Sequence, residues 1–361
     1  KKLAGFRNHH ENFKKRVSIA KRSYFEFCLI IGDPNPTVSK YEKKNWQKEC
    51  IKTLSFEAGY PSIINELPTL HRYTERGIIA PYLPIIQKRI QQLSAAAGIP
   101  IPALDVFLSS LLGSIEQLTR RAFILDLNIR ELKADLDGAN SSEKFNSFVQ
   151  TFTKPANRLE FAKSYPVLTR QIVTKLSNWE GMCSEFFQRL TADRLELAES
   201  FGISINANLK TVSQSGDTHN SGRSVFIIEF DDLSKIVYKP RNVSLEEGFQ
   251  KYIKYFNAYS TKLNLRCLNV LNRNEYGWVE FVNFEDQKNQ EESESYHYKL
   301  GYLTALVYSL CGVDIFFENL VSAGSDPIII DLEALFHTPI DFAIFDTPSQ
   351  NLQIFLNSSV A

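Results

Sequence analysis

The chain has 361 residues, of which 43% are hydrophobic, so it can bury one large core or two moderate ones, and two domains are the better expectation. Its 41 basic and 41 acidic residues cancel, which argues against nucleic acid or an anionic membrane as the main partner. We see no apolar run long enough to span a bilayer and no signal peptide, so we expect a cytoplasmic protein without an obligatory membrane partner. The five cysteines are scattered without CxxC or Cys-His spacing, which predicts neither a disulfide framework nor a structural zinc site.

The first part of the chain has the periodicity of amphipathic helices. From about residue 45 to residue 202, apolar residues recur every three or four positions, as they do on one face of a helix. Gly98, Gly138 and Gly202 fall where such helices should end, because glycine readily takes the left-handed conformation that closes a helix. We therefore predict a helical domain over residues 1–202.

Strand-like segments follow. "GRSVFIIEF" and "KIVYKP" are short and rich in β-branched and aromatic residues, and the "DDLS" between them is typical of a hairpin turn. A helix is predicted from about Ser244, because a serine opens it and acidic residues fill its first turn. Two more strands, around "LNVLN" and "YGWVEFV", lead to the charged loop "EDQKNQEESES" and then to the helix "YHYKLGYLTALVYSLCG". The pattern predicts an α+β protein whose second domain covers residues 203–361.

This order of elements is that of a protein-kinase-like fold, and its spacings suit phosphoryl transfer. Lys239 ends a predicted strand, where its ammonium could reach the phosphates of ATP, and Glu246 or Glu247 on the next helix could hold it in place. We also expect Arg241 and Glu280 near the nucleotide, with apolar cover from the strand around Trp278 and a hinge for adenine near Glu280.

A second group of polar residues lies further along the chain. Asp314 and Asn319 have the D-x-x-x-x-N spacing of a kinase catalytic loop. Asp331 follows twelve residues later, after the apolar segment 327–330, where a kinase carries a metal-binding aspartate, and Glu333 can add a second carboxylate. Each feature alone recurs often by chance, but their combination in one order is more specific.

Several motifs together resemble the dehydratase domain of class II lanthipeptide synthetases (LanM-type enzymes). They are "FILDLNIRELKADL", "SYPVLTRQI", "GDTHNSGRSVFIIEF", "KIVYKPR", "YGWVEFV" and "GVDIFFENLVSAGSDPIIIDLEALFH". The resemblance implies phosphorylation of Ser and Thr in a precursor peptide, built of a leader and a core, with ATP and Mg²⁺. Elimination of the phosphate then leaves a dehydroamino acid, and a separate C-terminal zinc domain adds cysteine thiols.

The resemblance also implies roles for individual residues. Lys239 matches the phosphate-binding lysine and Asp314 the catalytic aspartate. Asn319 and Asp331 match metal ligands, and Glu333 matches a further acidic position. The pair that the family uses for phosphate elimination matches Asp217 and His219, and an imidazole oriented by a carboxylate suits proton transfer near neutral pH.

The chain departs from the family pattern in two respects. The family usually has a histidine two residues after the catalytic aspartate, and this chain has Phe316, which can neither hydrogen-bond a phosphate nor relay a proton. The chain also ends soon after Glu333, so we expect a kinase-like N-lobe at about 203–283 and only the start of a C-lobe at about 295–361. The zinc domain and an Arg and a Thr that assist elimination would then be absent, and we expect weak nucleotide binding by this chain alone.

Two alternatives stay open. One is a kinase-like phosphotransferase that does not eliminate phosphate, against which the intact "GDTH" counts. The other is a non-catalytic peptide-binding protein, which Phe316 and the short second lobe favour. The sequence predicts no particular oligomeric state.

Overall fold

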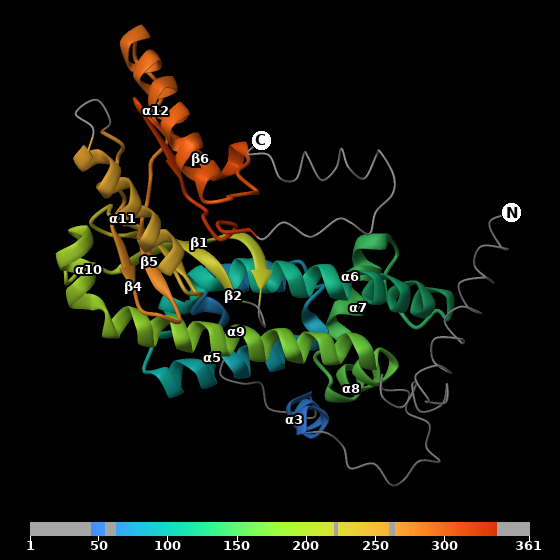
Figure 1. Cartoon of the computed structure of the whole chain (residues 1–361). Coiled ribbons are helices and arrows are strands. Elements are labelled where there is room, and N and C mark those ends of the chain that lie inside the picture. Colours follow the sequence, from blue (N-terminus) through green and yellow to red (C-terminus); the bar gives the residue numbers. More distant parts are fainter. Residues whose placement is uncertain (1–44, 55–62, 220–222, 260–263, 338–361) are drawn as a thin grey trace, which may run out of the picture. The chain divides into compact units, whose positions relative to one another are not determined.

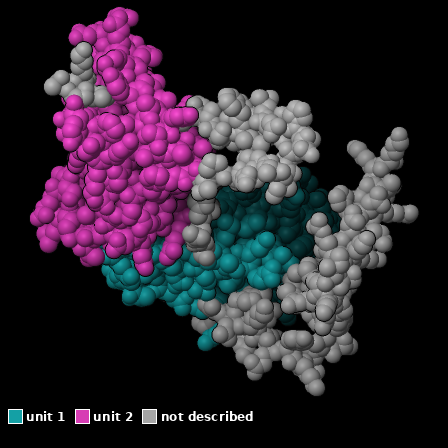
Figure 2. Space-filling view, viewed as in Figure 1, with its two compact units in different colours: residues 1–189 teal, residues 190–361 magenta. Residues whose placement is uncertain are grey.

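The computed structural model describes residues 45–54, 63–219, 223–259 and 264–337. The chain divides into two compact units, Lys1–Arg189 (unit 1) and Leu190–Ala361 (unit 2), which Figure 2 shows in different colours. The combination of a helical unit with a unit that holds antiparallel sheets confirms the predicted α+β class.

In its described ranges, unit 1 is built of helices (Figure 1), as the 3.6-residue periodicity predicts. The 3-10 helices are η1 (Ile64–Glu66), η2 (Ala80–Tyr82) and η3 (Ile101–Phe107). The α-helices are α3 (Asn45–Leu54), α4 (Pro68–Glu75), α5 (Leu83–Ala97), α6 (Leu108–Leu132), α7 (Ser141–Thr151), α8 (Pro155–Ser164) and α9 (Pro166–Ala192).

Two of the three glycines that the sequence placed at helix ends are confirmed there. Gly98 closes α5 and Gly202 closes α10 (Arg194–Phe201), both with left-handed backbone. The prediction for Gly138 is wrong, because α6 already ends at Leu132. Gly138 instead lies just before α7, where a Cβ would come within 2.6 Å of the side chain of Glu143.

The core of unit 1 contains a cluster of phenylalanines. Phe123 packs against Phe148 and Phe152 with ring centroids 4.8 and 5.9 Å apart, and Phe161 meets Phe152 edge-to-face at 5.4 Å. All four side chains are at most 2% exposed. Such contacts add to the free energy gained by burying the rings, and they join α6, α7 and α8.

One segment in the described part of the chain, Ile101–Leu132, is long and apolar enough to cross a membrane by length and composition alone. The expectation that no such segment exists is therefore wrong. The segment combines η3 with α6, and its buried residues include Leu112, Ile115 and Phe123. Packing in the core of unit 1 accounts for only part of its apolar character, because Ile124 and Leu125 are exposed.

Unit 2 contains a five-stranded antiparallel sheet in the order β1-β2-β3-β5-β4. Its strands are β1 (Leu209–His219), β2 (Arg223–Phe230), β3 (Lys235–Lys239), β4 (Val270–Asn272) and β5 (Gly277–Glu280). The predicted hairpin is confirmed, since β2 pairs with β3 across residues 231–234. Strand β1 was not predicted, because its residues 210–215 are mostly polar and exposed and lack the apolar alternation of a half-buried strand.

The pairing of β3 with β5 sorts the side chains onto two faces of the sheet. Tyr238 lies opposite Trp278, and Val237 lies opposite Val279. Because directly opposed residues share a face and successive residues alternate, Trp278 is on the face away from Lys239. Trp278 itself therefore faces away from Lys239, whereas Val279 of the same strand lines the lysine's face together with Val237.

Two long helices accompany this sheet. Helix α11 (Ser244–Tyr259) begins where the sequence predicts and runs alongside β4 and β5 (Figure 1). Helix α12 (Gln290–Ser309) begins earlier than predicted and includes most of the expected charged loop. The reason is a reciprocal cap: Asn289 accepts a hydrogen bond from the backbone of Glu292, whose carboxylate accepts one from the backbone of Lys288 at 2.8 Å.

A hairpin follows α12. It consists of β6 (Leu320–Ala323), which the sequence analysis missed, and β7 (Asp326–Ile329), which overlaps the predicted strand. Gly324 takes a left-handed backbone (φ 63°) in the two-residue turn, as such hairpins require. The hairpin packs into two apolar clusters: Ile328 contacts the cluster around Val243 and Val279, and Ile329 contacts that between α11 and α12.

Candidate functional site

Lys239 is the last residue of β3 and is only 4% exposed. Pro240 follows it, and because proline cannot donate to the strand ladder, the chain leaves the sheet there and turns toward α11. The sequence "VYKPR" thus fixes a lysine at the end of a sheet strand, on the face that carries α11.

The ammonium of Lys239 forms a buried ion pair with Glu246 in the first turn of α11. The Nζ–Oε1 distance is 3.0 Å, and the two side chains are 6% and 3% exposed. Burial would raise the pKa of Glu246, but the nearby charges of Lys239 and Arg241 outweigh burial and lower that pKa. The other candidate, Glu247, instead contacts Lys251 and Asn272. The geometry therefore selects Glu246 as the partner of Lys239.

Gly277 allows α11 to come this close to the sheet. It lies opposite Lys239 in the β3–β5 pair, and a Cβ at this position would be 2.1 Å from Cγ2 of Val243, just before α11. The role of Gly277 was not predicted from the sequence. A single glycine inside a strand pattern could have indicated it, because such a glycine often marks the close approach of another segment.

Asp331 is held next to Lys239. The ammonium donates to the backbone carbonyl of Ile330 at 2.9 Å and lies 3.9 Å from Oδ1 of Asp331. Burial of Leu332 and Leu335 in the cluster between α11 and α12 anchors this segment. The structure thus brings together Lys239 and Asp331, which are 92 positions apart in the sequence.

Arg241 joins the acidic residues of the site to one another. Its Nη2 lies 2.9 Å from Oε1 of Glu246 and 3.0 Å from Oδ1 of Asp331, and its Nε lies 3.2 Å from Oε2 of Glu333. Two cations, Lys239 and Arg241, therefore face three carboxylates. The cluster carries one excess negative charge when all five groups are ionised.

The loop with Asp314 and Asn319 meets this cluster at the base of the β6–β7 hairpin. The backbone N–H of Ile330 donates to the carbonyl of Asn319 at 3.0 Å, and the side-chain amide of Asn319 donates to the carbonyl of Asp314 at 3.1 Å. Asp314 is exposed and has a left-handed backbone (φ 63°), a strained conformation for a residue other than glycine. Within the described residues no hydrogen bond to its carboxylate occurs, so this group is open to a substrate.

Phe316 takes part in this loop through its backbone. Its carbonyl accepts a hydrogen bond from the N–H of Asn319 at 2.9 Å, while its side chain is 49% exposed. A histidine here would keep the same backbone bond and would add a proton donor at the surface.

One predicted residue, Glu280, is not gathered with Lys239. Glu280 ends β5 on the face of Trp278, and its carboxylate accepts hydrogen bonds from Arg266 at 2.7 Å and from the backbone of Asn269 at 3.0 Å. The side chains of Asp217 and His219 lie outside the described part of the structure.

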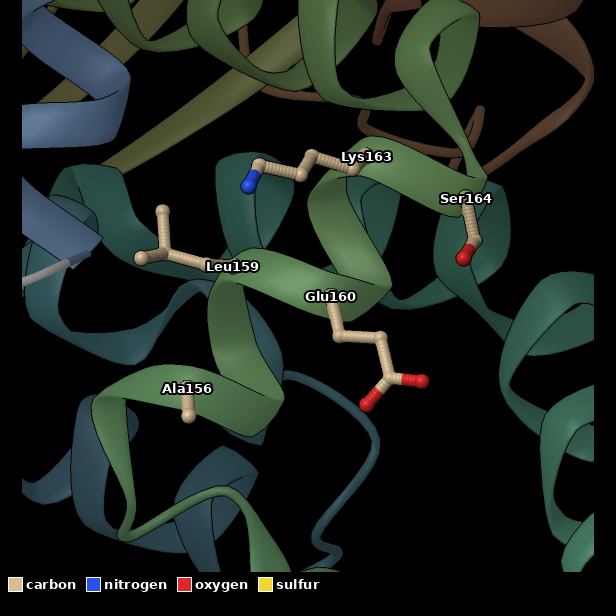
Figure 3. A pocket seen from close by; sticks show the side chains of 5 residues that line it. All are labelled: Ala156, Leu159, Glu160, Lys163 and Ser164. Carbon is tan, nitrogen blue, oxygen red and sulfur yellow. The ribbon is translucent and has the colours of Figure 1, made fainter.

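In the described ranges, the surroundings of Lys239 included, no group of three or more His, Cys, Asp or Glu side chains is arranged to hold a metal ion. A shallow hollow in unit 1 is lined by residues of α8 alone (Figure 3). It combines one cation and one carboxylate with small or apolar groups, so we assign it no chemistry. Its lining residues are Ala156, Leu159, Glu160, Lys163 and Ser164.

Similarity to known proteins indicates the family of the chain. Residues 165–361, more than half of the chain, match a family described as a domain of unknown function (DUF4135). The chain belongs to the DUF4135 family. The match covers β1 through β7 and both residues of the Lys239–Glu246 pair.

The chain is also similar to the "Lacticin 481/lactococcin biosynthesis protein LcnDR2" of Lactococcus lactis subsp. lactis. The two are 29% identical over 241 residues, which is 64% of this chain and 26% of that protein. The chain thus aligns with about a quarter of the relative's length. Together with the DUF4135 match, this confirms the resemblance to class II lanthipeptide synthetases.

Proposed function

We propose that unit 2 has a protein-kinase-like fold and that the chain serves as a lanthipeptide dehydratase. Its reaction would be ATP-dependent phosphorylation of Ser and Thr in a precursor peptide, followed by elimination of phosphate. Support comes from the five-stranded antiparallel sheet with α11 between β3 and β4, and from the biosynthetic role that the relative's name states. A precursor peptide would be the partner and the cytoplasm the location.

The observation that carries this proposal is the buried pair of Lys239 and Glu246. Protein kinases hold a lysine of the third strand with a glutamate of the following helix, and the pair presents the ammonium to nucleotide phosphates. Here the two atoms are 3.0 Å apart and the lysine also reaches the segment with Asp331. Burial removes the charges of Lys239 and Glu246 from water, which costs free energy. Stability of the fold alone therefore does not explain why this pair is present.

The residues of the site fit a nucleotide and Mg²⁺ by the chemistry of their donors. Lys239 and Arg241 would bind phosphate oxygens, and hard oxygen ligands for the metal would come from Asn319, Asp331 and Glu333. When bound, Mg²⁺ supplies positive charge to the phosphates. Asp314 would orient the substrate hydroxyl and take its proton, which its exposed carboxylate permits.

Phosphate elimination would use different groups. The reaction removes the proton next to the carbonyl of the phosphorylated residue and releases phosphate from the neighbouring carbon, which leaves a carbon–carbon double bond. We assign proton transfer in this step to His219, oriented by Asp217, on the basis of the family resemblance. Cyclisation by a zinc domain would be a separate activity.

One observation favours a second candidate function, peptide binding without catalysis. Phe316 replaces the histidine expected from the family, and its half-exposed ring offers no proton to a phosphate. The two functions differ in their products, so they can be separated directly.

Mass spectrometry of the precursor peptide after incubation with the full protein, ATP and Mg²⁺ tests the proposal. A suitable substrate would be a peptide encoded by a neighbouring short gene, with a leader and a Ser/Thr/Cys-rich core. We expect loss of water from the wild-type reaction, unmodified peptide with Asp314→Ala, and accumulated phosphopeptide with His219→Ala. Phosphopeptide as the final wild-type product would favour phosphorylation without elimination. An unmodified peptide in every reaction would refute phosphoryl transfer and favour the second candidate.

A further inference from the structure

Arg241 lies where a divalent cation is proposed to bind. We propose that Arg241 is an internal counter-cation that competes with the metal for Asp331 and Glu333, and that it moves onto Glu246 when the metal binds. This inference rests on the proposed function, because it assumes that the two carboxylates bind a metal. It adds a residue that sets the metal affinity of the site.

The geometry puts the two cations in competition for the same carboxylates. The guanidinium takes one oxygen of Asp331 at 3.0 Å and one of Glu333 at 3.2 Å. A divalent ion needs carboxylate lone pairs at short distance and adds two positive charges, which would repel a guanidinium in contact with the same groups. Departure of Arg241 from the two carboxylates therefore favours metal binding to them.

Glu246 offers the arginine a second position. Its Oε1 already accepts from both Lys239 and Arg241, whereas its Oε2 is buried and has no hydrogen-bond partner. A buried carboxylate oxygen without a partner is unfavourable, and a guanidinium can satisfy both oxygens of one carboxylate with two parallel bonds. A shift of Arg241 from Asp331 and Glu333 to Oε2 would thus replace the contacts that it loses.

The position of Arg241 in the chain permits such a shift. It lies in the connection between β3 and α11, outside regular secondary structure, and its side chain is 28% exposed. Its Nη2 is already 2.9 Å from Glu246, so a change of side-chain rotamer can make the move. The backbone of the sheet and of α11 can stay in place.

The experiment measures Mn²⁺ binding to the full protein without nucleotide, from the electron paramagnetic resonance signal of free Mn²⁺. In Arg241→Gln the competing charge is gone, and we expect binding about tenfold tighter than in the wild type, the equivalent of one charge-assisted hydrogen bond. Arg241→Lys is the matched control. It keeps the charge but cannot form two parallel bonds to Glu246, so we expect binding no tighter than in the wild type.

Asp331→Asn separates failure of this inference from failure of the metal site. If Asp331→Asn weakens Mn²⁺ binding but Arg241→Gln does not strengthen it, competition by Arg241 is refuted and the metal site stands. If Asp331→Asn has no effect in either the wild-type or the Arg241→Gln background, the site itself is wrong, and the inference falls with it. Tighter binding by Arg241→Lys would also refute it, and this result is available even if Arg241→Gln does not fold.

Discussion

The carboxylate of Asp193 ties the start of α10 to the β4–β5 hairpin, and we predict that Asp193→Ala strongly destabilises unit 2. One oxygen accepts from the indole of Trp278 at 2.7 Å and from the hydroxyl of Tyr276 at 2.8 Å. The other accepts from Nε of Arg273 at 2.9 Å. Because β5 pairs with β3, this carboxylate also supports the strand that carries Lys239.

The expected loss follows from the burial of these groups. A hydrogen bond to a charged group contributes about 1.5–3 kcal/mol, and the bond from Trp278 counts in full because that side chain is fully buried. Tyr276 and Arg273 are partly exposed and recover water contacts, and Arg273 keeps its ion pair with Glu196, so their bonds count for less. The sum is about 3–5 kcal/mol, the usual cost of removing one partner from a buried charged pair.

Urea unfolding together with hydrogen exchange of the β4–β5 amides measures this loss. Glu196→Gln is the control, because Glu196 contacts Arg273 from the surface, and its removal should cost much less stability than the removal of Asp193. The Asp193→Ala variant should unfold at lower urea concentration and exchange faster in β5. A loss no larger than that of the control would refute the reasoning that this carboxylate holds the hairpin.

Four further predictions concern the site. Lys239→Ala should weaken ATP binding by about tenfold or more in calorimetric titration, since a charge-assisted contact is lost; unchanged affinity would contradict the assignment. Gly277→Ala should push Val243 away from the sheet and lower the thermal unfolding temperature, whereas a neutral effect would mean that the start of α11 can move freely. The pKa of Glu246 is lowered in the folded protein, so its ionised form stabilises the fold at higher pH, and this stability is lost as the pH falls below 4.5 through the lowered pKa. Unfolding measured against pH should therefore show a smaller loss of stability in acid for Glu246→Gln than for the wild type. Identical pH profiles of the two proteins would contradict this prediction. Phe316→His should increase the yield of dehydrated peptide in mass spectrometry if the family's proton donor is useful here, and no change would show that another group serves.

Much of the fold of unit 2 could be predicted from local sequence patterns. The β2–β3 hairpin and the start of α11 are strongly marked, by apolar strands around "DDLS" and by a serine followed by two glutamates. Strand β1 could not be recognised, because an exposed edge strand shows no apolar alternation. The start of α12 was missed because the acidic residues that suggested a loop in fact cap the helix and lie in its first turn.

The site was predicted in its parts but not in its contacts. Lys239, Glu246 and Asp331 stand at element ends, which periodicity can locate, and the structure gathers them. The sequence could not show that Arg241 bridges three carboxylates, because such contacts depend on packing between α11, α12 and the β6–β7 hairpin. The face on which a strand residue lies depends on register, which explains why Glu280 was expected near Lys239.

The twelve-residue spacing between Asn319 and Asp331 is the length of chain that forms the β6–β7 hairpin. A backbone bond between Ile330 and Asn319 closes the base of the hairpin, and Gly324 lies in the turn at its far end. Residues inserted in pairs at the turn would lengthen both strands and leave the closed base unchanged. The separation of the two metal-binding candidates in space is therefore independent of their separation in sequence, and a search for related sites should fix the strand pairing and let the loop length vary.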